Sequence, residues 1–210
     1  MKTKIFITGS SGFIGFHLCK NLLENGFKVH GFDSMNNYYD VSLKQARLSC
    51  VSNYKAFTFA RADVSNLEAL KEITTKYGPF YRIIHLAAQA GVRHSLENPM
   101  AYVQSNLVGH AGILEICHGI DNFQHLVYAS SSSVYGGNAN TPCSVKDRVD
   151  RPISLYAATK AADELMSHTY SHLYNLPQTG LRFFTVYGPW GRPDMALYLF
   201  TEAILNDRPI

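Results

Sequence analysis

The chain has 210 residues, of which 46% are hydrophobic and 17% charged, and its formal net charge at pH 7 is +3. These values are those of an ordinary globular protein with a substantial core. The charge is slight and no run of lysines and arginines occurs, so the composition argues against a nucleic-acid partner. The sequence opens into a strand-like run and has no long apolar segment. We therefore expect a cytoplasmic chain with no membrane partner.

The cysteines and histidines form no metal-ligand or disulfide pattern. Cys19, Cys50, Cys117 and Cys143 lie far apart without a C-x-x-C pair, which favours reduced, packed thiols. His168 and His172 are four residues apart on a predicted helix, but no carboxylate or third ligand completes a metal site. We expect no metal.

Short apolar runs alternate with longer amphipathic ones along the chain. Strands are predicted at 5–8, 28–32, 56–61, 82–86, 125–129 and 180–186, and helices at 13–24, 67–76, 99–117, 155–174 and 195–205. This alternation predicts an α/β fold, a doubly wound parallel sheet of the Rossmann type with helices on both faces. Residues 34–53 and 136–152 interrupt the rhythm, and we interpret both as long loops with a functional role.

A glycine-rich turn separates the first predicted strand from the first helix. Gly9, Gly12 and Gly15 have the spacing G-x-x-G-x-x-G, with Phe13 and Ile14 opening the helix. Glycines there permit a tight turn and close approach of a pyrophosphate, and the helix N-terminus offers free N–H groups and positive dipole. In this strand-turn-helix context the motif predicts a dinucleotide site rather than a merely structural turn.

Carboxylates follow the second and third predicted strands. Asp33 lies eighteen residues beyond Gly15, where it could accept hydrogen bonds from both ribose hydroxyls and repel a 2′-phosphate, so NAD is favoured over NADP. A turn or capping aspartate is the alternative. Asp63, followed by Val64, could bind the adenine amine or simply cap the next helix.

Small residues follow the fourth predicted strand. Leu86, Ala87 and Ala88 would let a cofactor lie across the sheet edge, although a plain tight loop explains them equally well.

Tyr156 and Lys160 are four residues apart on one predicted helix and therefore share a face. A phenol has a pKa near 10 and is a poor base at neutral pH, but a neighbouring ammonium and an oxidised nicotinamide both favour the phenolate. The pair can thus serve as a general base, and Lys160 can also hold the nicotinamide ribose.

Four serines, at positions 130–133, end the fifth predicted strand. The C-terminal ends of parallel strands are where such sheets place their sites, so a hydroxyl there can bind and relay the proton of a substrate hydroxyl. A polar turn is the alternative for any one of them. We expect Ser131 to face the substrate.

Together these motifs resemble the extended short-chain dehydrogenase/reductase family, the NAD-dependent epimerases and dehydratases, over essentially the whole chain. More specific stretches, at 13–18, 37–40, 89–93, 95–99 and 185–195, are similar to those of UDP-glucuronate 4-epimerases.

The resemblance implies a tightly held NAD and interconversion of UDP-glucuronate and UDP-galacturonate through a transient 4-keto sugar. It assigns the grip on the sugar carboxylate to Arg192 and Thr185, for which a guanidinium fork and a hydroxyl are suited. A surface arginine beside a turn is the alternative for Arg192, and Arg93 is a second cationic candidate. Ser132 and Ser133 stand where related dehydratases and decarboxylases carry acids, which favours simple epimerisation.

Family members continue well past residue 210 into a domain that closes over the nucleotide sugar. We therefore expect residues 1–186 to be the NAD-binding domain and 187–210 the start of a substrate domain that is largely missing from this chain, with weak or absent turnover in this form. Two alternatives remain open: a 4-epimerase of a neutral UDP-hexose, and a non-catalytic NAD-binding protein. The resemblance also implies a homodimer built on the long helices at 99–117 and 155–174.

Overall fold

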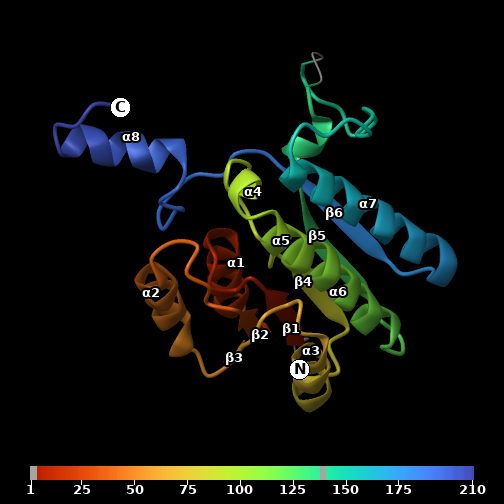
Figure 1. The fold of residues 1–210 in the computed structure, drawn as a ribbon. Coiled ribbons are helices and arrows are strands. Elements are labelled where there is room, and N and C mark those ends of the chain that lie inside the picture. The colour runs from red at the N-terminus through yellow and green to blue at the C-terminus, as the bar shows by residue number, and fades with distance from the viewer. Residues whose placement is uncertain (1–3, 138–140) are drawn as a thin grey trace.

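A computed structural model describes residues 4–137 and 141–210. Its six parallel strands form one sheet in the order β3-β2-β1-β4-β5-β6 (Figure 1). Their bounds are β1 (Lys4–Thr8), β2 (Lys28–Asp33), β3 (Phe57–Arg61), β4 (Arg82–His85), β5 (His125–Ser131) and β6 (Gln178–Phe183). The order reverses between β1 and β4, and such a reversal opens a crevice at the carboxyl ends of the strands. The predicted doubly wound, Rossmann-like sheet is confirmed.

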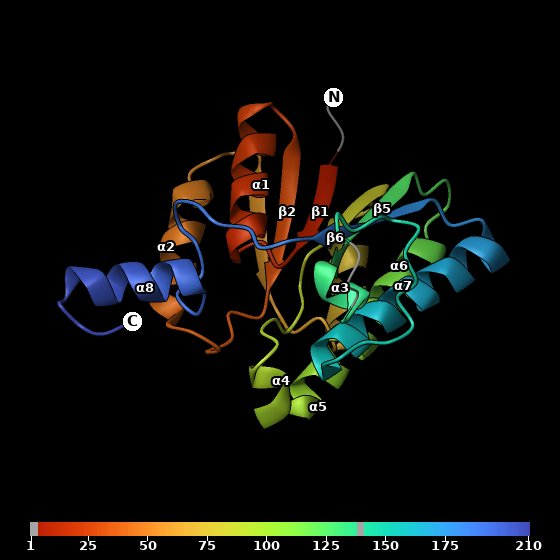
Figure 2. The same cartoon turned by 90° about the horizontal axis from the view of Figure 1, so that it is seen from above.

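Helices cover both faces of the sheet (Figure 2). They are α1 (Phe13–Glu24), α2 (Val41–Ser52), α3 (Leu67–Tyr77), α4 (His94–Glu97), α5 (Pro99–Tyr102), α6 (Gly109–His118), α7 (Leu155–Tyr174) and α8 (Ala196–Leu205). α1 and α2 pack on one face, over β1, β2 and β3, whereas α3, α6 and α7 pack on the other.

Alternate side chains of each central strand build two separate hydrophobic cores. In β1, Ile5 and Ile7 join Phe16 of α1 in one core, while Phe6 points to the opposite core with Ile83 of β4 and Leu126 of β5. A strand that is apolar on both faces is typical of a parallel sheet sandwiched between helices. This burial fixes the register of the strands and hence the positions of the loops that follow them.

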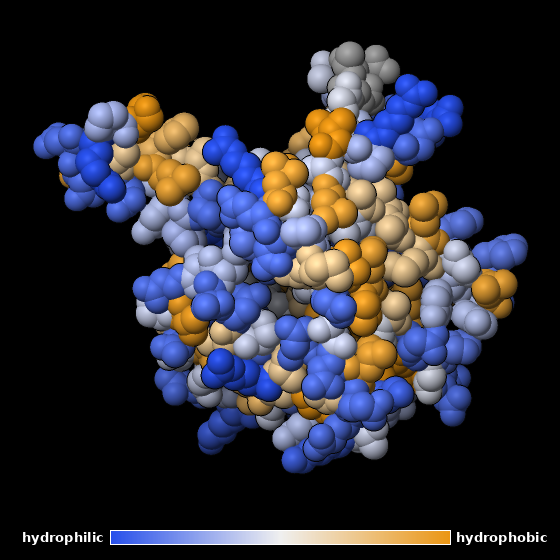
Figure 3. Space-filling model, in the orientation of Figure 1, coloured by the Kyte–Doolittle hydropathy of each residue, from blue (hydrophilic) through white to orange (hydrophobic). Residues whose placement is uncertain are grey.

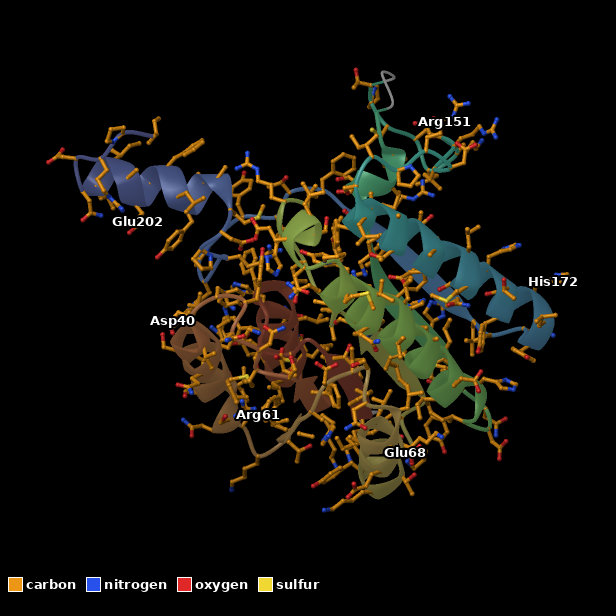
Figure 4. The ribbon with its side chains drawn as sticks, in the orientation of Figure 1. Asp40, Arg61, Glu68, Arg151, His172 and Glu202 are labelled. Atoms are coloured by element: carbon orange, nitrogen blue, oxygen red, sulfur yellow. The ribbon has the colours of Figure 1, made fainter. Side chains whose placement is uncertain are left out.

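The prediction of a long loop at 34–53 is wrong in its second half, where the structure has α2. The labelled Asp40 marks the start of this helix in Figure 4, and its side chain accepts a hydrogen bond from the Ser42 N–H at 2.8 Å. The inward face of α2 carries Lys44 and Arg47 beside Val51. Because polar residues occupy buried positions, the sequence shows no apolar period there.

The predicted helix at 99–117 is continuous but not uniform, because residues Val103–Val108 form a π-helical turn between α5 and α6. Asn106 in this turn is buried and bonded on three sides. Its Oδ1 accepts from the Gln89 N–H at 2.8 Å, and its Nδ2 donates to the Gln89 carbonyl and to Thr159 Oγ1 at 3.2 and 3.0 Å. The wide turn therefore ties the segment after β4 to α7, next to Lys160.

α8 projects from the body of the molecule (Figure 1), and its surface mixes exposed apolar side chains with hydrophilic ones (Figure 3). Leu197, Phe200 and Ile204 have exposed fractions of 57, 50 and 62%. Within the described residues, no helix has the length and apolarity needed to cross a membrane. All four cysteines are free thiols.

Candidate active site

One cavity of about 710 Å³ opens at the carboxyl ends of the strands. Every residue predicted from the sequence to bind cofactor or substrate, or to act in catalysis, lines it. These residues are Gly9, Gly12, Phe13, Ile14, Gly15, Asp33, Asp63, Val64, Leu86, Ala87, Ala88, Arg93, Ser131, Ser132, Ser133, Tyr156, Lys160, Thr185 and Arg192. Side chains scattered over the chain thus meet at the switch point of the sheet, where this fold places its ligands.

The glycine turn after β1 is packed so closely that side chains are excluded. Gly9 has φ +71°, and a Cβ on it would lie 2.7 Å from the Ala87 nitrogen. A Cβ on Gly15 would lie 2.0 Å from the Gly9 carbonyl oxygen. The first turn of α1 therefore folds directly against the loop, and its free N–H groups face the cavity as an anion site.

Asp33 is buried at the end of β2 beside this turn. Its Oδ2 accepts from the Ser11 N–H at 3.0 Å and its Oδ1 from the Met35 N–H at 2.9 Å. Each oxygen keeps a second acceptor position, which ribose hydroxyls could use. The structure therefore shows the turn role that was the alternative for Asp33, and the ribose role stays a prediction.

Lys44 of α2 also lines the cavity and was missed by sequence reasoning. Its Nζ lies 4.0 Å from Asp33 Oδ1 and donates to Asn36 Oδ1 at 2.6 Å. Burial lowers the pKa of Lys44, which outweighs the opposing effect of Asp33. The signal that could have revealed it is its place one helical turn before Arg47, on the buried polar face of an unrecognised helix.

Asp63 is exposed at the cavity edge and holds the turn that precedes α3. Its Oδ1 accepts from the N–H and the hydroxyl of Ser65, at 2.9 and 2.7 Å. The cap of α3 is Asn66, whose Oδ1 accepts from the Ala69 N–H at 3.1 Å. Asp63 therefore does not cap α3. It stabilises the turn at 63–65, just before the cap residue Asn66.

Tyr156 and Lys160 lie in the first turns of α7, which Ser154 caps by accepting from the Ala157 N–H at 3.1 Å. Lys160 is buried, and its Nζ donates to the Ala129 carbonyl of β5 at 2.9 Å and to Asp163 Oδ2 at 3.1 Å. The Tyr156 ring meets the Tyr102 ring edge-on, with centroids 6.1 Å apart. α7 therefore holds the phenol and the amine against the end of β5.

Asp163, the buried partner of Lys160, was not foreseen. Burial raises the pKa of its carboxyl to about 6, against the opposing pull of Lys160. Its Oδ1 has no hydrogen-bond partner in the described structure, and the Lys160 charge is shared with the Ala129 carbonyl. Both features account for a carboxylate that remains costly to ionise despite the neighbouring ammonium.

The serines at the end of β5 and in the turn that follows it have two different roles. Ser131 begins a 3₁₀ turn, Ser132–Tyr135, and accepts from the Ser133 N–H at 3.1 Å. Ser130 instead donates to Glu164 Oε1 of α7 at 2.5 Å, and Glu164 is held by a two-point ion pair with Arg182 of β6. Ser130 therefore braces the strand end from which Ser131, Ser132 and Ser133 reach the cavity.

Arg192 enters the cavity from the segment that follows β6. Its Nε donates to Asp194 Oδ1 at 3.0 Å and its Nη2 to Asp194 Oδ2, and Tyr38 donates to that same Oδ2 at 2.9 Å. Burial lowers the pKa of Arg192, but Asp194 outweighs it, so the pKa lies above its ordinary value. The two N–H groups on Nη1 are not used by this pair. A second carboxylate could approach them.

The other predicted substrate contacts are exposed at the cavity mouth. Arg93 precedes α4, and Thr185 lies beyond the end of β6, which stops at Phe183. The predicted strand at 180–186 therefore ends three residues too late and begins two residues after the observed start at Gln178. Outside the cavity, His168 and His172 are both exposed on α7, and Figure 4 shows His172 projecting from the far end of that helix. Among the described residues, no group of three metal-ligating side chains occurs.

Comparison with known proteins gives the same family. A family model described as GDP-mannose 4,6-dehydratase matches residues 6–207. Protein CapI of Staphylococcus aureus is 57% identical over 207 residues, which are 99% of this chain and 61% of that protein. A probable UDP-glucuronate 4-epimerase of Rhizobium meliloti (strain 1021) is 52% identical, over 99% of this chain and 60% of its own length. The chain thus spans about three fifths of the length of these relatives.

Solved structures agree. The crystal structure of UDP-glucuronic acid 4-epimerase from Bacillus cereus, in complex with UDP-glucuronic acid and NAD, has a TM-score of 0.91 and 34% identity, covering 99% of this chain and 64% of that one. The UDP-glucose 4-epimerase of Thermus thermophilus, in complex with NAD, has a TM-score of 0.85 and 29% identity, with the same coverage. Since the family model matches nearly every residue, the chain belongs to the GDP-mannose 4,6-dehydratase family, which confirms its predicted membership of the extended short-chain dehydrogenases/reductases.

Proposed function

We propose that this chain is the NAD-binding part of a UDP-glucuronate 4-epimerase, with residues 1–186 as the cofactor domain and 187–210 as the start of the substrate domain. The observation that carries the proposal is the convergence of the glycine turn, the Tyr156/Lys160 pair and Arg192 on one cavity. The relatives named UDP-glucuronate 4-epimerase and the Bacillus cereus complex with UDP-glucuronic acid and NAD support it.

The residues present fit NAD. The cradle formed by Gly9 and Gly15 admits backbone but no Cβ, so a pyrophosphate can approach the α1 N-terminus. Asp33 and Lys44 stand where the adenosine ribose would lie, and the Asp33 carboxylate would repel a 2′-phosphate. When bound, NAD supplies the acceptor and then the donor of the hydride exchanged with C4 of the sugar. Lys160 would hold the nicotinamide ribose.

In this reaction the residues of the chain must transfer the proton of the sugar 4-hydroxyl and bind the sugar carboxylate. Tyr156 takes the proton from the sugar 4-hydroxyl, Ser131 hydrogen-bonds to that hydroxyl, and Lys160 lines the same cavity. The resulting 4-keto sugar turns in the cavity and regains a proton from Tyr156 after its other face is reduced. Arg192 and Thr185 grip the carboxylate meanwhile, which disfavours loss of CO₂ from the β-keto acid.

Ser132 and Ser133 add hydroxyls and no acid at the reacting edge, and this favours epimerisation over dehydration or decarboxylation. Arg93 lines the same cavity as a further cationic contact. We also propose that the protein acts in the cytoplasm as a homodimer. Four free thiols suit a reducing compartment, and α7 exposes apolar side chains for pairing.

The test is a comparison of the parent chain with Tyr156→Phe. We expect both to bind NAD, detected by mass analysis of the released dinucleotide, and only the parent to convert UDP-glucuronate to UDP-galacturonate. Single-turnover reduction of bound NAD is measured as well, because it detects the first hydride transfer independently of net epimerisation. A chain that binds NAD but shows no tyrosine-dependent reduction with any UDP-sugar would instead be a non-catalytic binding protein.

The acid specificity is tested separately with Arg192→Leu. We expect this variant to lose affinity for UDP-glucuronate by roughly tenfold or more, as a charge-assisted bidentate contact is lost, and to bind UDP-glucose as before. A parent chain that prefers UDP-glucose, with Arg192→Leu unchanged, would point to a neutral-sugar 4-epimerase.

A further inference from the structure

The segment that carries Arg192 is fastened to the N-terminal half of the fold. We call residues 188–194 the Arg192 segment. The exposed His17 of α1 donates from Nε2 to the Pro189 carbonyl at 2.9 Å, and the Phe16 and Trp190 rings meet edge-on with centroids 5.8 Å apart. Two stretches that stand out in the sequence, 13–18 and 185–195, thus contact each other directly.

The centre of this contact is Arg47 of α2, which is fully buried. Its Nη2 donates to the Trp190 and Gly191 carbonyls at 2.6 and 3.2 Å, and its Nε donates to the Trp190 carbonyl at 3.2 Å. Nη1 donates to the carbonyl of Ser11 in the glycine turn at 3.2 Å and to Tyr39 Oη at 2.6 Å.

This guanidinium is compensated in an unusual way. In the described structure no carboxylate lies within ion-pair distance of Arg47, so its charge is stabilised by carbonyl and hydroxyl oxygens. A buried charge is retained only where its hydrogen bonds are all made, and each of its three nitrogens is engaged here. Arg47 therefore fixes the relative positions of α2, the glycine turn and the Arg192 segment.

The carbonyls that Arg47 holds belong to the two peptide units immediately before Arg192. Trp190 has φ +62°, a left-handed conformation that is uncommon for a bulky residue. Holding both carbonyls fixes these peptide planes and thereby the direction in which the Arg192 side chain leaves the backbone. Tyr38 and Asp194 then orient the guanidinium itself.

We propose that Arg47 is a positioning residue that sets acid-sugar specificity by fixing the Arg192 segment against the cofactor-binding turn. The proposal rests on the proposed function, since it assigns the acid preference to Arg192. Arg47 touches neither sugar nor cofactor in this role. It acts through the Trp190 and Gly191 carbonyls, and its contact with Ser11 makes the substrate grip depend on an intact dinucleotide loop.

Trp190 is the sole tryptophan of the chain, so its fluorescence reports directly on the Arg192 segment. In Arg47→Met, which keeps length but loses every donor, we expect a red-shifted emission and stronger acrylamide quenching, with unchanged far-UV circular dichroism. With saturating NAD, the ratio of UDP-glucose to UDP-glucuronate dissociation constants should fall roughly tenfold towards one. Arg47→Lys has one point charge in place of the guanidinium fork, so its emission and quenching should lie between those of the parent and Arg47→Met.

His17→Ala keeps the inference testable if Arg47→Met does not fold, because His17 is exposed and fastens the same segment. It should change quenching and acid preference in the same direction by a smaller factor. Arg82→Met is the matched control, since Arg82 donates to Gln124 at the amino end of the central strand β4, whereas the cavity lies at the carboxyl ends of the strands. It should change neither.

Two negative results separate the inference from the function. If Arg192→Leu abolishes acid preference while Arg47→Met and His17→Ala keep it within about twofold of the parent, the positioning role of Arg47 is wrong and the proposed function stands. If the parent itself shows no acid preference and Arg192→Leu changes nothing, the proposed function is wrong, and the role of Arg47 in specificity is overturned with it.

Discussion

At the scale of single residues, the shape of the cavity depends on glycines, whose missing side chains allow close backbone packing. Gly9 and Gly15 let backbone meet backbone beneath the first turn of α1, and Gly91, with φ +100°, lets Tyr38 pass within reach of Asp194. The reactive residues are then held by short links to neighbours, as Lys160 is by Ala129 and Asp163. Close backbone packing at the glycines and hydrogen bonds to the reactive side chains together hold the cavity in one arrangement.

Gly15→Ala tests this directly. The added Cβ would lie 2.0 Å from the Gly9 carbonyl oxygen, so the loop must move. We expect a loss of roughly 2–3 kcal/mol in the free energy of unfolding from overpacking, and a more than tenfold loss of NAD affinity. Urea unfolding and equilibrium binding measure the two. Gly137→Ala, where a Cβ meets nothing within 4 Å, should change stability by less than about 0.5 kcal/mol. Equal effects of both substitutions would contradict the packing argument.

At the scale of elements, α7 brings the chemistry to the sheet and is stabilised at both its cap and its inner face. Ser154 caps it two residues before Tyr156, and Lys160 and Glu164 connect it to β5 and β6. Sequence periodicity predicted the whole of α7 correctly. It missed α2, because the buried face of α2 is polar, and its side chains bond to residues outside the helix, such as Asn36, Ser11 and Trp190.

Ser154→Ala should lower the free energy of unfolding by about 1 kcal/mol, the usual cost of losing a helix cap. It should also fray the turn that carries Tyr156, which amide hydrogen exchange at residues 155–158 would detect. Thr169→Ala on the same helix is the control, because Thr169 is exposed and caps nothing. Protection at Ala157 and Ala158 that is unchanged in Ser154→Ala would refute the link between cap and site.

Asp163 predicts a pH dependence of stability. Its pKa is raised by burial from 3.8 to about 6, so folding favours the protonated form. This stabilisation is present below about pH 4 and is lost as the pH rises through 6. Relative to Asp163→Asn, the parent should lose on the order of 2–3 kcal/mol of unfolding free energy between pH 4 and 7, measured by urea titrations at each pH. Parallel curves for the two proteins would contradict it.

The neighbouring Glu164 supplies a control of opposite sign. Burial alone would raise its pKa, but hydrogen bonds from Arg182 and Ser130 outweigh burial and hold the pKa below its usual range. Its contribution to stability is therefore present at neutral pH and lost as the pH falls. On acidification the parent should lose stability relative to Glu164→Gln and gain stability relative to Asp163→Asn, because the pKa values of the two carboxyls are shifted in opposite directions.

At the scale of the whole molecule, exposed apolar surfaces indicate where the chain meets other protein. Leu165 and Leu173 of α7 are 69 and 59% exposed and lie eight residues apart, two turns along one side of the helix. Apolar side chains on one helix face, beside α6, suit the proposed homodimer.

We expect Leu165→Glu combined with Leu173→Glu to convert a dimer into a monomer, because charges would be buried at the pairing face. Sedimentation velocity gives the oligomeric state. Leu197→Glu on α8, which is 57% exposed in the parent, serves as the matched control and should leave the dimer intact. Dissociation by the α8 variant alone would place the interface elsewhere.

Sequence by itself determined the alternation of strands and helices apart from α2 and the short α4, the glycine turn, and the candidate cofactor and substrate residues around the cavity apart from Lys44. It could do so because backbone conformation and apolar alternation are local properties that neighbouring residues encode. Only the tertiary structure decided that Arg47 lies buried beneath the Arg192 segment, that Asp163 pairs with Lys160, and that Asp194 occupies two donors of Arg192. These contacts join polar groups that are distant in the chain, share one helix or lie two residues apart in a loop. Packing and desolvation choose their partners and leave no period in the sequence.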